Sequence, residues 1–68
     1  MTTEELKRLE QEYSNAAGID RIDLLHDLSK GYLHSNPLKT VRYAEIALDL
    51  SSDLQNEEKI ALSYKYLG

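Results

Sequence analysis

Hydrophobic residues recur at intervals of three and four along most of the chain, which is the spacing of amphipathic helices. Residues that start or stop helices divide this pattern into four stretches. We predict helices over residues 3–17, 20–35, 37–54 and 57–67. The β-branched residues are few and never alternate over the length of a strand. The pattern therefore predicts an all-α fold built from antiparallel helical hairpins.

The predicted boundaries rest on local capping chemistry. Thr2-x-x-Glu5 has the spacing of a capping box, in which the first side chain accepts a backbone hydrogen bond. Gly18 is interpreted as the C-terminal glycine of the first helix. Asn36-Pro37 separates the second helix from the third, because Asn caps and Pro is tolerated in the first turn. Asn56 is expected to cap the fourth helix.

Each helix has one apolar face that predicts how the helices pack. On the second helix this face is Ile22, Leu25, Leu28, Ser29 and Tyr32. On the third it is Leu38, Val41, Ala44, Ala47, Leu48 and Leu54. The small side chains of Ala44 and Ala47 allow a close approach of the second helix. The fourth helix is expected to cover the apolar face that remains.

Composition excludes several classes of function. The 68 residues make one domain at most, and no cysteine is present for a disulfide or a Cys-based zinc or redox site. The net charge is −4, with eight basic residues scattered among twelve acidic ones, which argues against nucleic acid. No apolar run is long enough for a membrane span, and the first residues do not form a signal peptide. We expect a cytoplasmic protein without a cofactor.

A spacing motif recurs near the end of the chain. Tyr64-x-x-Leu67-Gly68 repeats the spacing of Leu25-x-x-Leu28-Ser29, 39 residues later. Two-helix repeats have periods of about 34 residues in the tetratricopeptide type and about 40–47 in longer types. The offset lies between these values and predicts a repeat architecture.

These motifs resemble the tetratricopeptide repeat family, in the longer-helix variety found in bacterial sensor kinases and transcription regulators. The family's first helix carries a large residue, Leu, Gly and Tyr at fixed spacing, and the second carries small residues before Ala-Leu. The matching positions here are Leu25, Leu28, Ser29 and Tyr32, then Thr40, Tyr43/Ala44 and Ala47-Leu48. Ser29 stands where the family has Gly, Thr40 where it has Ala, and its closing Pro has no counterpart.

The resemblance implies a division of the single 1–68 module. Residues 20–55 correspond to one full repeat, 56–68 to the first helix of the next, and 1–18 to a preceding or capping helix. About three repeats are usually needed for independent stability. We therefore predict either a fragment of a longer array or a homo-oligomer, which can include exchange of helices.

The family implies a non-enzymatic role in binding a peptide or helix of a partner protein. Its concave positions would fall near Asp23, His26, Lys30 and His34, and the basic pair Lys30 and His34 is suited to an acidic segment. Tyr66 lies off the apolar face and is predicted to be exposed for contact with a partner. Three tyrosines at helical spacing (Tyr32, Tyr43 and Tyr64) are predicted to be core residues.

Two alternatives use the polar residues of the second helix. Asp20, Asp23, His26 and Asp27 carry metal-ligand atoms, but a single helix offers too few ligands, so a solvated acidic helix terminus is the favoured interpretation. His26 followed by Asp27 is similar to the phosphoacceptor segment of sensor kinases, which suggests a dimerising segment of a bacterial signalling protein. A purely structural oligomerisation element is the third possibility. No serine has a His–Asp arrangement that predicts catalysis.

Overall fold

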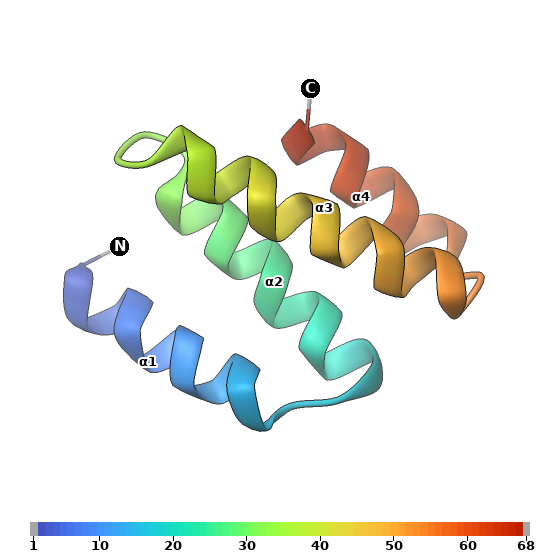
Figure 1. The fold of residues 1–68 in the computed structure, drawn as a ribbon, viewed down its shortest axis with the longest axis horizontal. Helices are drawn as coiled ribbons and strands as arrows, with labels where there is room; N and C mark the ends of the chain where they lie inside the picture. Colours follow the sequence, from blue (N-terminus) through green and yellow to red (C-terminus); the bar gives the residue numbers. More distant parts are fainter. Residues whose placement is uncertain (1, 68) are drawn as a thin grey trace.

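The chain folds into four helices joined by short turns, in a computed structural model that describes residues 2–67 (Figure 1). The helices are α1 (Thr3–Asn15), α2 (Gly18–Tyr32), α3 (Pro37–Asp53) and α4 (Glu57–Leu67). No strand occurs among the described residues. The all-α prediction is confirmed, and each helix begins and ends within three residues of its predicted bounds. Gly68, the last residue of the repeated motif, lies outside the described part of the chain.

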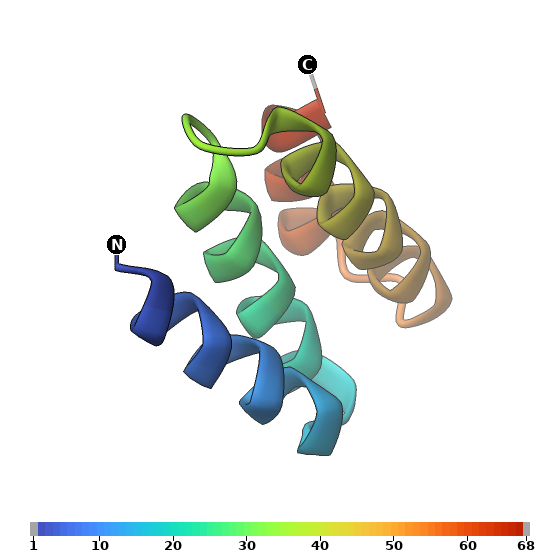
Figure 2. The ribbon, with the colours of Figure 1, turned by 60° about the vertical axis from the view of Figure 1, so that its left-hand side comes forward.

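Successive helices run in opposite directions, and α2 lies between α1 and α3 (Figures 1 and 2). The backbone of α2 is in contact with the other three helices, while α4 packs mainly on α3 and runs in the direction of α2. The Cα atoms extend over 32 × 27 × 14 Å, so the helices form a thin slab. None of the described helices combines the length and apolar character needed to cross a bilayer.

The three predicted side-chain caps are present. In each case the first residue accepts a hydrogen bond from the backbone N–H of the third residue after it, at 3.2, 3.3 and 3.2 Å (Thr2 and Glu5, Asn36 and Lys39, Asn56 and Lys59). Pro37 is in the first turn of α3, as predicted. These local signals therefore set three of the four helix starts.

The prediction for Gly18 was wrong. α1 ends at Asn15, Ala16 is extended, and Gly18 is the first residue of α2 with a φ of +63°. The helical period continues through Ala16 and Ala17 in the sequence, but the backbone leaves the helix before them. The positive φ explains why a glycine is suited to this position, since L side chains rarely adopt it.

The predicted contact between α2 and α3 forms the core. Ile22, Leu25 and Leu28 of α2 and Ala44 and Ala47 of α3 are fully buried. Burying each large aliphatic side chain contributes about 1.5–3 kcal/mol. The alanines leave room for the leucines, which confirms the predicted close approach.

Ser29 and Thr40 also lie in this contact, where their hydroxyls join the two helices. Both are buried, and each hydroxyl donates to the backbone carbonyl of the other residue, Ser29 Oγ at 3.1 Å and Thr40 Oγ1 at 2.9 Å. A reciprocal pair of buried hydrogen bonds therefore joins α2 and α3.

Several predicted core residues are exposed. Leu38 is 82% exposed, and Val41 and Leu54 are also exposed, so the apolar face predicted for α3 is not continuous. The buried face of α3 consists instead of small residues (Thr40, Ala44, Ala47 and Ser51). Tyr64 is 59% exposed and Tyr66 is half-buried, the reverse of the prediction. The reason is the rotation of α4, which turns Ser63 rather than Tyr64 toward α2.

Candidate functional site

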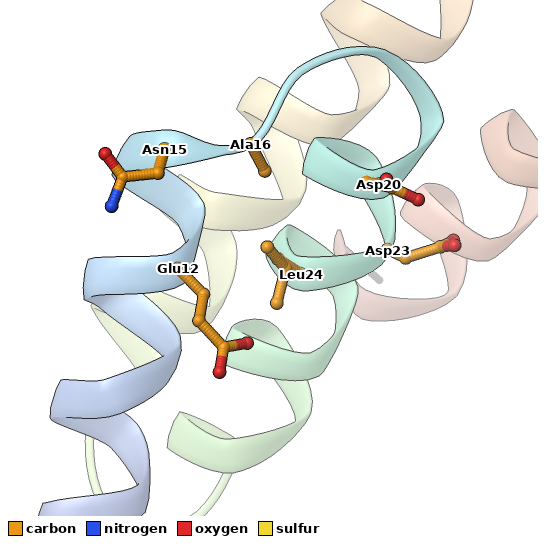
Figure 3. Close-up of a pocket in the computed structure, with 6 residues that line it drawn as sticks. All are labelled: Glu12, Asn15, Ala16, Asp20, Asp23 and Leu24. Atoms are coloured by element: carbon orange, nitrogen blue, oxygen red, sulfur yellow. The ribbon is translucent and has the colours of Figure 1, made fainter.

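One hollow on the surface lies between the end of α1 and the start of α2 (Figure 3). Its volume is about 530 Å³. It is lined by Glu12, Asn15, Ala16, Asp20, Asp23 and Leu24. Three of these side chains are carboxylates and one is an amide, around the apolar Ala16 and Leu24. We call this site the α1–α2 hollow.

The sequence places these residues together through a short connection between antiparallel helices. Glu12 and Asn15 belong to the last turn of α1, and two residues later the chain enters α2 with Asp20 in its first turn. A carboxylate is favoured there by the positive end of the helix dipole. The end of α1 then adds a further carboxylate, so that negative charge accumulates on one open surface.

Asp23 connects the rim of the hollow with α4. Its carboxylate accepts a hydrogen bond from the Lys59 ammonium group at 2.5 Å, in the one ion pair found among residues 2–67. The side chain of Asp23 is 49% exposed and that of Lys59 21% exposed. The hydrogen bond from Lys59 to Asp23 raises the pKa of Lys59. Asp23, which lines the hollow, thus already binds the ammonium group of Lys59.

His26 is buried between α2 and α4, with 7% of its surface exposed. Its Nε2 lies 2.8 Å from the Ser63 hydroxyl, and its ring centroid lies 6.0 Å from that of Tyr66. Burial lowers the pKa of His26, and the charge of Lys59 lowers it further. His26, which was predicted to contact a partner, is therefore enclosed by residues of this chain. The same burial disfavours His26 as a phosphoacceptor, because that role needs an accessible ring nitrogen.

Lys30 and His34 remain exposed and lie together, as their spacing predicted. They line a separate hollow of about 300 Å³ with Gly31 and Ser35. Asp23 lines the α1–α2 hollow instead, and Tyr66 packs beside His26. The five predicted partner-binding residues therefore do not form one surface.

Glu10 makes a structural contact that the sequence did not reveal. Its two carboxylate oxygens accept hydrogen bonds from Tyr32 at 2.7 Å and Tyr43 at 2.8 Å. These bonds, first that of Tyr32, lower the pKa of Glu10. Burial raises the pKa of Tyr43, and the bond to Glu10 raises it further. Glu10 thus ties α1 to both α2 and α3 and holds the α1 wall of the hollow in place.

An aromatic and cationic contact adds to this attachment of α1. The Tyr13 and Tyr43 rings meet edge to face with centroids 6.2 Å apart. The Arg21 guanidinium lies 4.4 Å from the centre of the Tyr13 ring, and it also donates to the Tyr13 hydroxyl at 3.1 Å. The sequence did not predict these contacts of α1, because Glu10 is one of many acidic residues and no spacing motif distinguishes it.

Residues 2–67 were compared with the geometry that a metal site needs. Within the described residues, no group of three or more His, Asp or Glu side chains has a geometry that could hold a metal ion. Comparison of the chain with protein-family models, with curated proteins and with solved structures gives no match.

Proposed function

We propose that this chain is a non-enzymatic interaction module that binds a basic segment of a partner protein in the α1–α2 hollow. The observation that carries the proposal is that Glu12, Asp20 and Asp23 line one hollow together with the apolar Ala16 and Leu24. The ion pair between Asp23 and Lys59 supports the choice of a cationic ligand. The partner is thus of opposite charge to the acidic segment expected from Lys30 and His34.

The composition of the hollow suits a lysine or arginine side chain. Such a side chain has an aliphatic stem, which can lie on Ala16 and Leu24, and a cationic head that keeps contact with water. Glu12 and Asp20 are exposed and offer the carboxylates for charge-assisted hydrogen bonds. The net charge of −4 further favours the approach of a basic segment.

The helix arrangement supports a tetratricopeptide-like interaction module. α2 begins at residue 18 and α4 at residue 57, which is 39 residues later and equals the offset of the repeated motif. The two helices run in the same direction on the same neighbour, α3. We infer a repeat unit that works in the cytoplasm, in a longer array or as a homo-oligomer. Sedimentation across a concentration series tests the oligomer.

Peptide binding tests the site. A short peptide in which Lys and Arg alternate with Leu is titrated into the labelled protein, and backbone NMR shifts are followed. We expect shifts centred on residues 12–24, and an affinity that weakens as salt is added. A peptide with Glu in place of Lys and Arg should not bind there.

Substitution separates a specific site from general charge attraction. The double variant Glu12→Gln/Asp20→Asn removes two charges from the hollow and should weaken binding about 10-fold. The matched control Glu45→Gln/Asp49→Asn removes the same charge from the exposed face of α3 and should change binding much less. Equal weakening in both variants would show that net charge alone attracts the peptide. If the acidic peptide instead shifts the NMR signals of Lys30 and His34, the binding site is the smaller hollow.

A further inference from the structure

The contact between α2 and α4 is made largely by polar side chains, with a buried histidine among them. Asp23 pairs with Lys59, and one turn further along both helices His26 meets Ser63. The Tyr66 ring then lies beside the imidazole. We propose that this contact is a pH-sensitive latch, in which uptake of a second proton by the His26 ring releases α4 from α2.

The neutral imidazole fits its surroundings. The Ser63 hydroxyl lies 3.0 Å from the Lys59 carbonyl, to which it donates, and 2.8 Å from His26 Nε2. A hydroxyl has one proton, so when Ser63 donates to the carbonyl, Nε2 must carry the ring proton and donate to Ser63. In this arrangement the second proton, taken from water, binds at Nδ1.

The charged imidazolium does not fit. It would be buried at the helix contact, and the ammonium group of Lys59 would add a like charge from α4. Asp23 and Asp27 of α2 favour the charged ring and offset part of this cost. The charged groups that act on His26 are these three, while Tyr66 faces the ring as a neutral aromatic. Burial and the charge of Lys59 outweigh the two carboxylates, so the pKa of His26 is lowered.

The direction of the pH effect follows from this lowered pKa. Release of α4 exposes His26 to water, where its pKa returns to about 6.5. The released form therefore binds the proton more tightly than the docked form. Docking is complete above about pH 6.5 and weakens as the pH falls below that value. Each pKa unit of difference between the two forms changes the docking equilibrium about 10-fold.

The chain contains a matched control for this proposal, since its two histidines are the buried His26 and the exposed His34. Hydrogen-exchange protection of individual amides is measured between about pH 7.5 and 5, a range in which histidine titrates. We expect the protection of α4 amides to fall relative to that of α3 amides as the pH is lowered. His26→Gln, which cannot take up the proton, should abolish this change, and His34→Gln should retain it.

Three outcomes would overturn the latch. Equal loss of protection in α3 and α4 would mean global unfolding rather than release of one helix. A pH effect that persists in His26→Gln would assign it to another group. The third test needs no variant: if the His26 ring in the wild-type protein titrates at or above its ordinary value in an NMR titration, the proposal fails even if His26→Gln does not fold.

Discussion

The ammonium group of Lys59 lies 2.5 Å from a carboxylate oxygen of Asp23, so that a side chain of α4 is paired with a residue that lines the α1–α2 hollow. The two residues are far apart in the sequence and are joined by the parallel course of α2 and α4 (Figure 1). Lys59 therefore occupies the kind of contact that a basic partner would make with Asp23. The position of α4 and the charge of the hollow are linked through this pair.

Removal of this internal cation should strengthen binding of the basic peptide. In Lys59→Met the stem remains while Asp23 becomes available, and we expect affinity to rise several-fold. The free energy of unfolding should fall by about 1 kcal/mol or less, because the pair is partly exposed. Fluorescence anisotropy with the labelled peptide measures the affinity. Lys65→Met, on the exposed side of α4, has the same change in net charge and should have a smaller effect. Equal gains in both variants would contradict a direct role for Lys59.

Glu10 should contribute more to stability than its position on α1 suggests. Glu10→Gln keeps the shape but loses the charge that strengthens the bonds from Tyr32 and Tyr43. We expect the free energy of unfolding to fall by about 1–2 kcal/mol, measured by urea denaturation. Glu45→Gln, on the exposed face of α3, is the control and should change it by no more than about 0.5 kcal/mol. A Glu10→Gln variant as stable as the control would show that these bonds have no net effect.

The Glu10 carboxylate also predicts part of the loss of folding stability at acidic pH. The pKa of Glu10 is lower in the folded protein than its ordinary value because Tyr32 and Tyr43 donate to the charged form. The folded state therefore binds this proton less tightly than the unfolded chain. The stabilisation is complete above the ordinary pKa of 4.5 and is lost as the pH falls through the lowered value. Urea midpoints of Glu10→Gln should fall less steeply than those of the wild type in this range.

The features that follow from local chemistry could be predicted from the sequence. Asn36-Pro37 contains its own start signal, and the burial of Leu25 and Ala44 follows from the helical period. These properties depend on residues within one or two turns, so a single stretch of sequence contains the information. The fold class and the α2–α3 contact were obtained in this way.

The rotation of α4 could not be obtained from the period. Tyr64 with Leu67 and Tyr66 with Leu62 fall on two faces of comparable apolar character. The polar pairs with Asp23 and His26 are present for only one rotation, and each joins residues more than 30 positions apart. The hollow depends in the same way on the end of α1 meeting the start of α2. The partner-binding residues that were predicted mainly from one helix therefore lie on separate surfaces of the folded chain.

Thr40 provides a test of whether the buried hydrogen bonds between α2 and α3 stabilise the fold. Thr40→Val keeps the shape and removes the hydroxyl that donates to the Ser29 carbonyl at 2.9 Å. We expect a loss of about 1 kcal/mol in the free energy of unfolding, since one buried hydrogen bond is lost while packing is kept. Thr3→Val makes the same change at an exposed residue of α1 and should be nearly neutral. Urea denaturation of both variants gives the difference. If Thr40→Val were as stable as the wild type, shape alone would account for Thr40, and the reciprocal hydrogen bonds with Ser29 would not stabilise the α2–α3 contact.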